Sequence, residues 1–350
     1  MSIIPISASA CYKVEIAGGL LSSLGQRAAQ VVSGRVAFVV TDDVVADFCL
    51  HRAVSSLEDA GFRVFTHIIP HGEQSKAGPN YLELLNLLAE SRLTRSDLLV
   101  ALGGGVVGDL AGFTAATYLR GIPYIQIPTT LLAMVDSSVG GKTAINLPMG
   151  KNLAGAFYPP KYVLCDPEIL STLPENVFRD GCAEVIKYAV LGSPKLFCVL
   201  MHRPIVEQLP EVIETCITMK RNYVQEDEFD RGARQFLNLG HTLGHGVELA
   251  SNYTLSHGQA VAVGMAMVSR AAVSLGFCTA ETCRNIEELL TRFGLPTRTE
   301  IPHCDLLQAA LGDKKRQGDK LTLVVPKEIG HCILHRIGVE ELPRWIALGG

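Results

Sequence analysis

The sequence predicts an α/β domain built on a mostly parallel sheet over residues 1–178, followed by a mainly α-helical domain over residues 179–350. Three observations carry this prediction. Short apolar segments alternate with helix-like segments in the first half, which is typical of a parallel sheet covered on both faces. A glycine-rich turn follows one of those apolar segments, and after about Thr172 the pattern becomes almost entirely helical. A length of 350 residues accommodates two such domains.

Five strands are expected in the first domain. Each candidate is short, is rich in Val, Ile, Leu or aromatic residues, and is bounded by Gly, Pro, Asp or Thr. The candidates are residues 35–40, 63–69, 98–102, 124–127 and 162–165. Helical patterns lie between them, and residues 79–89 show the clearest one, with Pro79 suited to a first turn. Ligands of such sheets bind beyond the carboxyl ends of the strands.

The second domain is expected to be helical from residue 174 to residue 293. Gly294 and Pro296 then interrupt the pattern, as is typical just past the end of a helix. Strand-like segments return only near residues 321–325 and 332–337, which predicts one small hairpin.

Charge and cysteine usage narrow the class of protein. The formal net charge is -4 and the pI is about 6.2, which argues against a partner such as nucleic acid or an anionic membrane. The 10 cysteines form no C-x-x-C pair, and their scatter is typical of buried thiols in a reducing compartment. The N-terminus lacks the features of a signal peptide, and no apolar run is long enough to span a bilayer. We therefore expect a cytoplasmic protein.

The glycine-rich turn is the first functional signal. Gly103, Gly105 and Gly108 satisfy G-x-G-x-x-G between an expected strand and an expected helix. Glycines let the backbone approach a pyrophosphate, and a helix N-terminus offers free N–H groups to it. The motif alone is equally compatible with a tight structural turn, and no acidic residue follows about 20 positions later to bind a ribose. A bound dinucleotide would therefore take its ribose partners from other strand ends, such as Asp42 or Glu73.

Acidic and histidine side chains in the second half indicate a metal site. His241 and His245 are four residues apart and share one helix face, and His257 follows after a loop. Glu184 lies upstream in the segment CAEVIKY. One Glu and two His suit Zn²⁺ or a similar divalent ion, and three protein ligands leave a position open for substrate. The spacing does not decide which two of the three histidines bind the metal.

Basic side chains lie in or beside Gly-, Asn- or His-rich motifs. Lysine acts as a point charge toward phosphate, and arginine forks onto carboxylate or phosphate. The cluster therefore indicates a small acidic, phosphorylated substrate. Its members are Arg120, Lys142, Lys151, Lys187, Lys220 and Arg234.

Taken together, the motifs resemble the 3-dehydroquinate synthase family of sugar phosphate cyclases. The resemblance covers nearly the whole chain through HGEQSK, GGGVVGDLAGF, IPTTLLAMVDSSVGGKTAIN, GKNLAGAFYPP, AEVIKY, LNLGHTLGHGVE, LSHG and DKK. Several long motifs in one order are far more specific than any single one. The resemblance implies a Rossmann-like NAD-binding domain, a helical second domain, an active site in the cleft between them, and a homodimer.

The resemblance also implies the site residue by residue. The metal ligands would be Glu184, His241 and His257, and His245 would contact substrate or transfer a proton. The NAD contacts would be Asp42, Gly72, Glu73, Lys76, Gly104, Gly105, Val106, Val107, Gly108, Asp109, Thr129, Thr130, Lys142, Lys151 and Thr172. The contacts to the substrate's carboxylate and phosphate would be Asp136, Lys142, Asn152, Lys187, Lys220, Arg234, Asn238 and His245. Arg120 would come from the neighbouring subunit, and one of Lys314 and Lys315 would join these contacts.

Two positions depart from the pattern that the resemblance implies. Asp230 stands four residues before Arg234, where the family commonly has Glu, and Gly246 stands where Ala is common. A glycine inside a helix costs about 1 kcal/mol relative to alanine. Neither position is an expected ligand, so the departures bear on fine geometry only.

The implied reaction converts 3-deoxy-D-arabino-heptulosonate 7-phosphate to 3-dehydroquinate and phosphate, the second step of the shikimate pathway toward chorismate and the aromatic amino acids. One divalent ion, Zn²⁺ or Co²⁺, would chelate two adjacent hydroxyls. Bound NAD⁺ would oxidise C5, phosphate would leave by β-elimination, and NADH would reduce the ketone again. Ring opening and an intramolecular aldol step would close the carbocycle, so NAD would act catalytically.

Three other functions stay open. A sibling cyclase of the 2-deoxy-scyllo-inosose or epi-valiolone synthase type would act on a different sugar phosphate. A metal-dependent alcohol dehydrogenase would release NADH stoichiometrically, and an NAD-binding sensor would turn over no sugar phosphate. A carboxylated substrate, and hence the dehydroquinate synthase reaction, is favoured by the set Asn152, Arg234, Asn238 and His245.

Overall fold

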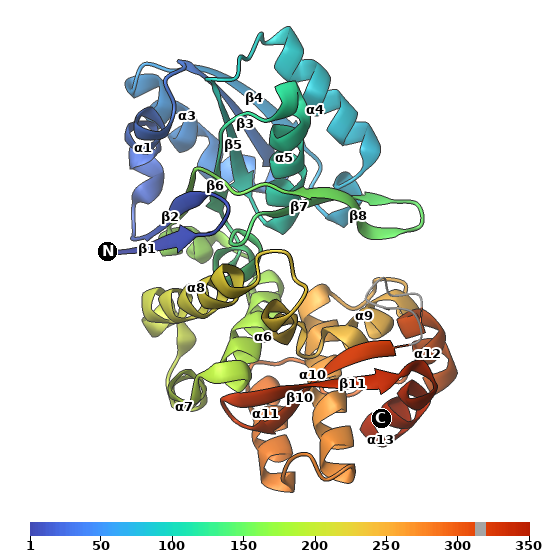
Figure 1. Cartoon of the computed structure of the whole chain (residues 1–350). Coiled ribbons are helices and arrows are strands. Elements are labelled where there is room, and N and C mark those ends of the chain that lie inside the picture. The colour runs from blue at the N-terminus through green and yellow to red at the C-terminus, as the bar shows by residue number, and fades with distance from the viewer. Residues whose placement is uncertain (312–319) are drawn as a thin grey trace. The chain divides into compact units, whose positions relative to one another are not determined.

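The computed structural model describes residues 1–311 and 320–350, and their contacts divide the chain into two compact units (Figure 1). The first unit comprises Met1–Pro174 and Lys220–Phe229, and the second comprises Glu175–Met219 and Asp230–Gly350.

This division differs from the expected boundary after residue 178 in two places. Residues 175–178 belong to the helical unit, because they form the first turn of the continuous helix α6 (Glu175–Gly192). Residues 220–229 return to the first unit, where Glu228 accepts hydrogen bonds from the backbone N–H and the hydroxyl of Ser9. Local helical periodicity carries no information about such a return, since it depends on a contact between distant residues.

The first unit is built on a seven-stranded sheet with the strand order β1-β2-β9-β6-β5-β3-β4. Its strands are β1 (Ser2–Ser7), β2 (Cys11–Ile16), β3 (Val36–Asp42), β4 (Arg63–Ile69), β5 (Leu98–Gly103), β6 (Tyr124–Pro128) and β9 (Tyr162–Cys165). Neighbouring strands are parallel except for the antiparallel pair β1 and β2. The five expected strands and the mostly parallel sheet are confirmed.

The β1–β2 hairpin lies outside the prediction. Pro5 in β1 interrupts the strand signal, because proline cannot donate to a ladder and is tolerated mainly on edge strands. β1 is one of the two edge strands of this sheet, so its proline is accommodated there.

Helices cover both faces of the sheet (Figure 1). Leu98, Val100 and Leu102 of β5 point into a core that includes residues of α1 (Leu24–Val31) and α3 (His51–Asp59). The alternate residues of β5 point to the opposite core, beneath α4 (Gly78–Glu90) and α5 (Gly105–Thr117). Burial of both faces explains the continuous apolar run in this strand. The expected helix at residues 79–89 corresponds to α4.

A second hairpin lies beside α5. It is formed by β7 (Lys142–Leu147) and β8 (Gly150–Phe157), which pair only with each other as an antiparallel ribbon. It also lies outside the prediction, because glycines and charged residues hide the strand pattern of its sequence. A short helix, α2 (Asp43–Val45), follows β3.

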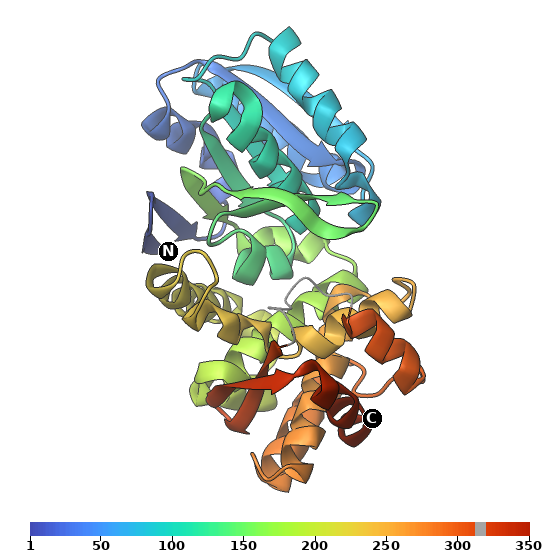
Figure 2. The same cartoon turned by 45° about the vertical axis from the view of Figure 1, so that its right-hand side comes forward.

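The second unit is mainly helical. Its elements are α6 (Glu175–Gly192), α7 (Pro194–His202), the first part of α8 (Leu209–Glu226), α9 (His241–Ala250), α10 (His257–Ser274), α11 (Ala280–Arg292), α12 (His303–Leu311), β10 (Lys320–Glu328), β11 (His331–Gly338) and α13 (Leu342–Gly349). The long helix α10 is largely buried and contacts α6, α9, α11 and α13 (Figure 2). The expected hairpin near the C-terminus is confirmed as β10 and β11.

Among residues 1–311 and 320–350, the helices are too short or too polar to cross a lipid bilayer. All ten cysteines are free thiols, and six of them are buried. The expectation of buried thiols is wrong for Cys11, Cys198 and Cys304, which are exposed.

A buried carboxylate ties the N-terminal hairpin to the rest of the first unit. Glu15 of β2 is 1% exposed and accepts two hydrogen bonds from the Arg27 guanidinium at 2.7 and 3.1 Å. The Tyr162 hydroxyl donates a third bond at 2.8 Å. The hydrogen bonds from Arg27 outweigh burial and hold the pKa of Glu15 below its usual range.

We predict that Arg27→Ala lowers the free energy of unfolding by about 2–3 kcal/mol, because it leaves the buried Glu15 charge without its cation. Chemical denaturation monitored by circular dichroism measures the change. The double variant Glu15→Gln/Arg27→Ala is the control, and it should be more stable than Arg27→Ala because the buried charge is gone. A loss below about 0.5 kcal/mol for Arg27→Ala would put this pair among ordinary surface ion pairs.

Candidate functional site

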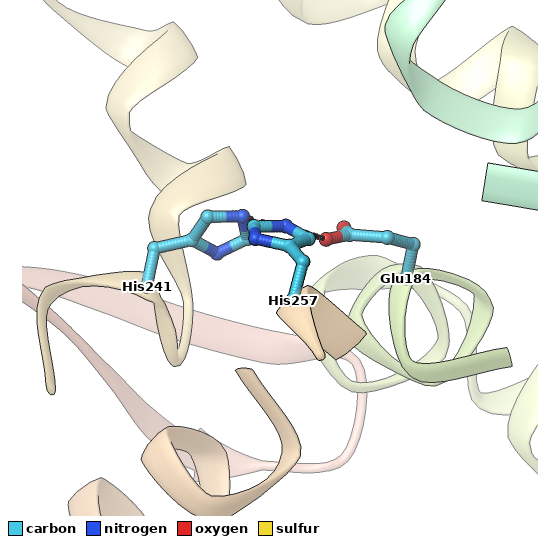
Figure 3. Close-up of side chains that lie close together, drawn as sticks. All are labelled: Glu184, His241 and His257. Atoms are coloured by element: carbon cyan, nitrogen blue, oxygen red, sulfur yellow. Dashed lines mark hydrogen bonds and ion pairs between the residues drawn. The ribbon is translucent and has the colours of Figure 1, made fainter. Parts of the chain in front are cut away.

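Three side chains of the second unit meet at one point. Glu184 lies on α6, and His241 and His257 are the first residues of α9 and α10. The Glu184 Oε1 atom lies 3.2 Å from Nε2 of His257 and 3.4 Å from Nε2 of His241. Figure 3 shows both imidazole rings directed toward the carboxylate. The structure thus brings together the three residues expected to be metal ligands.

Small residues allow the start of α9 to pack closely on α10. Gly240 precedes α9 with φ +78, a conformation that other residues rarely adopt. A Cβ atom on Gly264 of α10 would lie 2.0 Å from the Gly240 carbonyl oxygen. Glycine at both positions therefore permits the close backbone contact that places His241 near His257.

The two separations from Glu184 fit a tetrahedral ion, and all three ligand atoms lie within 4.8 Å of one another. Ligand atoms bound to Zn²⁺ at about 2.0–2.1 Å lie about 3.3–3.4 Å from one another in a tetrahedron. The observed 3.2 and 3.4 Å agree with that spacing. One carboxylate oxygen and two imidazole nitrogens are also donors that Zn²⁺ and Co²⁺ accept. The residues present therefore fit one divalent ion with a fourth position open.

The second ring nitrogen of each histidine also faces an acceptor. Nδ1 of His241 lies 3.0 Å from the Leu239 carbonyl oxygen, and Nδ1 of His257 lies 3.6 Å from a Glu248 carboxylate oxygen. Such acceptors orient a metal-binding imidazole and fix which nitrogen carries the proton. His245, Glu248 and His257 form a second acidic and histidine group. We interpret this group as the surroundings of the metal site and not as a second metal site, because the Nε2 atom of His257 already faces Glu184.

Charge is concentrated at the centre of the cluster. The Lys187 ammonium lies 2.5 Å from Glu184, and both side chains are 1% exposed. Burial opposes the ionisation of Glu184, but Lys187 and the two histidines outweigh it and hold the pKa of the carboxyl well below its usual range. Burial likewise opposes the protonation of His257, but Glu184 and Glu248 outweigh it and raise the pKa of the imidazole to about 10. Without a metal, His257 is therefore protonated at neutral pH.

Other expected residues of the second unit lie on adjoining elements. The ring of His245 lies 5.5 Å from that of His241, one helical turn further along α9. Arg234 and Asn238 lie in the helical turn at residues 233–238, which contacts α6, and Arg234 is 2% exposed. A fully buried arginine on the element beside the cluster suits the recognition of an anion.

The expected dinucleotide residues of the first unit surround two strand ends. The chain passes from β3 to β4 on one side of β3 and then places β5 on the other side, so β3 and β5 flank a topological switch point. In open parallel sheets, ligands bind at the carboxyl ends of strands at such a point. Asp42 ends β3, and Gly103 ends β5 and is followed by the N-terminus of α5. Asp42 therefore takes the position of a ribose-binding acidic residue, which the sequence after the glycine motif lacks.

Four groups of expected residues follow the carboxyl ends of strands in this sheet. Thr129 and Thr130 follow β6, the next strand along, and the Thr129 N–H donates to the Gly103 carbonyl oxygen at 3.1 Å. The remaining groups are Gly104, Gly105, Val106, Val107, Gly108 and Asp109 at the start of α5; Gly72, Glu73 and Lys76 after β4; and Thr172 in the turn after β9.

A polar network joins this region to the β7–β8 hairpin. Lys76 is 5% exposed, and its ammonium lies 3.0 Å from Asp109 and 3.2 Å from Glu73. Burial favours the neutral amine, but the two carboxylates outweigh it and raise the pKa of Lys76. Glu73 accepts a bond of 2.7 Å from the Asn146 amide, and the Asn146 side-chain oxygen accepts one of 2.9 Å from the Asn152 N–H. These contacts hold the loop after β4 against α5 and the hairpin.

The remaining expected residues of the first unit lie on several different elements. Lys142 begins β7, and Lys151 and Asn152 lie on β8. Asp136 forms an ion pair with Lys220 of α8. Arg120 is exposed just beyond the end of α5, and the 13 residues of this helix separate Arg120 from Gly105 by about 20 Å. Lys314 and Lys315 lie outside the described residues.

Sequence reasoning did not single out Glu248, Asp180 or Asn146. Asp180 is four residues before Glu184, and Glu248 is three residues after His245, so helical spacing places each on the face of an expected site residue. That signal was present, but only the contacts across helices distinguish these carboxylates from solvated ones.

Comparison with known proteins identifies the relatives of this chain. A family model described as 3-dehydroquinate synthase N-terminal matches residues 66–180, and one described as 3-dehydroquinate synthase C-terminal matches residues 181–316. A 3-dehydroquinate synthase of Pelobacter propionicus is 43% identical over 341 residues, which cover 95% of this chain and 94% of that protein. A 3-dehydroquinate synthase of Streptococcus pneumoniae is 41% identical over 342 residues, which cover 96% of both.

Solved structures of sugar phosphate cyclases share the fold. A 2-deoxy-scyllo-inosose synthase complexed with carbaglucose-6-phosphate, NAD⁺ and Co²⁺ is 25% identical, with a TM-score of 0.89 and coverage of 100% of both chains. A 2-epi-5-epi-valiolone synthase from Streptomyces hygroscopicus with NAD⁺ and Zn²⁺ bound is 24% identical, with a TM-score of 0.88 and coverage of 98% of both. An iron-containing alcohol dehydrogenase, 16% identical with a TM-score of 0.65 and coverage of 97% of both, shows the broader fold alone.

We predict that metal uptake at pH 7.5 releases at least one proton. His257 is protonated in the metal-free protein, because its pKa is raised to about 10, whereas a metal-bound imidazole is neutral. Apparent metal affinity should therefore rise with pH up to that pKa. Calorimetric titration with Zn²⁺ in two buffers of different ionisation enthalpy measures the number of protons.

Glu248→Gln is the matched variant for this measurement. It removes one of the two carboxylates that raise the pKa of His257, so fewer protons should be released at pH 8.5. Metal binding by the unaltered protein without proton release would show that His257 is neutral before the ion arrives.

Proposed function

The chain belongs to the 3-dehydroquinate synthase family, and we propose that it converts 3-deoxy-D-arabino-heptulosonate 7-phosphate to 3-dehydroquinate and inorganic phosphate. The observation that carries this proposal is the cluster of Glu184, His241 and His257 in a chain 41–43% identical to 3-dehydroquinate synthases over nearly its full length. The enzyme is thus a carbon–oxygen lyase that eliminates phosphate.

We propose NAD and one divalent ion, Zn²⁺ or Co²⁺, as cofactors. Glu184, His241 and His257 would hold the ion, and their spacing fits it. When bound, the ion supplies Lewis-acid polarisation of the substrate's hydroxyl groups. The nucleotide would occupy the switch point between β3 and β5, with its pyrophosphate at the start of α5 and its ribose near Asp42.

The chain's own side chains have three tasks in this reaction. The buried cations Lys187 and Arg234 would hold the anionic substrate in register, which reduces the entropy cost of reaching the transition state. Asn152, Asn238 and Lys142 would add contacts to its carboxylate and phosphate. His245 groups with Glu248 and His257, whereas the two proposed ligands group with Glu184, and His245 would relay a proton.

The rival functions fit less well. The sibling cyclases are only 24–25% identical, whereas the 3-dehydroquinate synthases are 41–43% identical. The alcohol dehydrogenase shares the fold at 16% identity. Product analysis by mass spectrometry separates the cyclases from one another, and net accumulation of NADH would reveal a dehydrogenase. NAD binding without any sugar-phosphate turnover would indicate a sensor.

We propose a cytoplasmic homodimer in which Arg120 acts in the neighbouring subunit. Two observations on this chain support it. Arg120 is exposed, and it lies at the opposite end of α5 from the glycine-rich turn, so its own α5 holds it away from that turn. The ten free thiols are compatible with a reducing cytoplasm.

The decisive experiment measures phosphate release from 3-deoxy-D-arabino-heptulosonate 7-phosphate. We expect release that requires both NAD and a divalent ion, with no net change in NADH absorbance. A strong chelator should abolish release, and added Zn²⁺ or Co²⁺ should restore it. Glu184→Ala should lose turnover and bound metal together, because it removes the carboxylate common to both histidine contacts.

Elemental analysis of Glu184→Ala gives the independent readout. Full metal occupancy in that variant would contradict the proposed ligand set, even if the enzyme were inactive. Phosphate release that continues without NAD would contradict the proposed reaction.

Mixing two inactive variants tests the dimer. Arg120→Ala and Glu184→Ala should each be inactive alone. After subunit exchange, a random mixture should recover about a quarter of the wild-type activity, since half of the dimers are mixed and each mixed dimer has one intact site. No recovery despite demonstrated exchange would place Arg120 in its own subunit's site. An Arg120→Ala variant that stays active alone would place it outside any site.

A further inference from the structure

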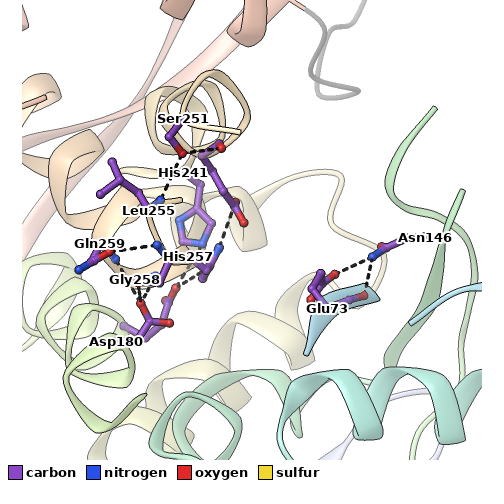
Figure 4. A network of polar contacts seen from close by, with 12 residues as sticks. Glu73, Asn146, Asp180, His241, Ser251, Leu255, His257, Gly258 and Gln259 are labelled. Atoms are coloured by element: carbon purple, nitrogen blue, oxygen red, sulfur yellow. Dashed lines mark hydrogen bonds and ion pairs between the residues drawn. The ribbon is translucent and has the colours of Figure 1, made fainter. Parts of the chain in front are cut away.

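A carboxylate outside the metal cluster accepts hydrogen bonds from the start of α10. Asp180 lies on α6, and its Oδ1 atom accepts hydrogen bonds from the Gly258 N–H at 2.7 Å and the Gln259 N–H at 3.2 Å. The Ser256 hydroxyl donates a third, short bond to the same oxygen. Figure 4 shows this group beside His257.

These bonds are made by residues on both sides of His257 in the sequence. Ser256 and Gly258 are its immediate neighbours, so Asp180 holds the Ser256 side chain on one side of His257 and the Gly258 backbone N–H on the other. Asp180 is also four residues before Glu184, and both therefore point from the same face of α6. One face of α6 therefore carries both carboxylates. Glu184 faces the imidazole of His257, and Asp180 binds the two residues next to His257.

The two helices touch at this point. A Cβ atom on Gly258 would lie 2.1 Å from the Asp180 carbonyl oxygen, which is closer than any side chain could approach. Glycine after His257 therefore lets the start of α10 rest on the α6 backbone, where the Asp180 side chain can reach its first N–H groups.

The hydrogen bonds to Asp180 do more than cap the start of α10. α10 already has a capping box, in which the Ser256 N–H donates to the Gln259 side chain at 3.0 Å and the Ser256 side chain accepts from the backbone of Gln259. That box satisfies helix-start groups from within α10. The bonds to Asp180 come from a different helix, and their added effect is to fix where α10 starts relative to Glu184.

We propose that Asp180 is a positioning residue that holds His257 at metal-binding distance from Glu184. The inference rests on the proposed function, because it concerns the same ion. Asp180 contacts neither the ion's proposed ligand atoms nor the reacting groups. It acts by fixing the first turn of α10 on α6. The distance between Nε2 of His257 and Oε1 of Glu184 then stays close to the distance between two ligand atoms of a tetrahedral ion.

Two variants at this position separate geometry from charge. Asp180→Ala removes the acceptor, whereas Asp180→Asn keeps an oxygen at the same place and removes the charge. We expect Asp180→Ala to bind Zn²⁺ about 10–100-fold more weakly, the usual effect of losing a group that supports a ligand. Asp180→Asn should stay within about threefold of wild type, because one oxygen accepts all three bonds.

Metal affinity of the metal-free protein is measured by competition with a chromophoric chelator. The visible spectrum of bound Co²⁺ provides a second readout, because it responds to the arrangement of the ligands. Asp180→Ala should alter the spectrum, and Asp180→Asn should preserve it. If Asp180→Ala does not fold, Asp180→Glu replaces it: the longer side chain displaces the acceptor and should weaken Zn²⁺ binding at least about tenfold relative to Asp180→Asn.

Thr279→Ala is the matched control. Thr279 caps α11 by accepting a hydrogen bond from the Thr282 N–H at 3.1 Å, outside the metal cluster. Its loss should lower thermal stability, as the loss of a helix cap usually does, and should leave Zn²⁺ affinity unchanged. A purely structural role for Asp180 would give the same result as Thr279→Ala.

The outcomes distinguish the two proposals. Wild-type protein that fails to bind Zn²⁺ through Glu184, His241 and His257 overturns the proposed metal site. Wild-type protein that binds, together with Asp180→Ala that binds equally well and keeps the Co²⁺ spectrum, overturns the positioning role alone. Equal losses in Asp180→Ala and Asp180→Asn would also overturn it, since charge rather than geometry would then be responsible.

Discussion

The proposed site depends on one oxygen atom. Oε1 of Glu184 faces the Nε2 atoms of His241 and His257, and these three residues come from three different helices. The arrangement exists because α9 starts where its backbone can touch α10, at Gly240 and Gly264. In addition, Asp180 accepts hydrogen bonds from the Gly258 and Gln259 N–H groups in the first turn of α10. A site of this kind needs helix starts held to within a fraction of an ångström, and small residues with hydrogen bonds between helices provide that accuracy.

Electrostatics makes the same site ready to bind. Glu184 is buried, and a buried carboxylate is stable only beside compensating charge. Lys187 and the protonated His257 supply that charge without a metal, and a divalent ion can replace the proton on His257. In the first unit, Lys76 and its two carboxylates form another buried charge group, which holds a loop near the glycine-rich turn. In each unit, buried charged side chains therefore lie near the N-terminus of a helix.

Parts of the fold followed directly from local pattern. The buried strands β3 and β5 contain continuous apolar runs, and such runs predict strands of a parallel sheet. The hairpins β1–β2 and β7–β8 escaped prediction, because their stability comes from pairing and edge position and because Pro5 and the glycines of β8 weaken the local signal. The return of residues 220–229 to the first unit was equally invisible, since it rests on contacts with distant residues such as Ser9.

The sequence by itself determined the family, the residue types of the site and the one carboxylate and three histidines from which the ligands would come, because these reside in contiguous motifs. Only the tertiary structure decided how they combine. It directed the Nε2 atoms of His241 and His257 toward Glu184, and it placed Glu248 behind His257 and Asp180 at the start of α10. The physical reason is that a coordination site and its supports are distances between helices, and no spacing along one helix specifies them.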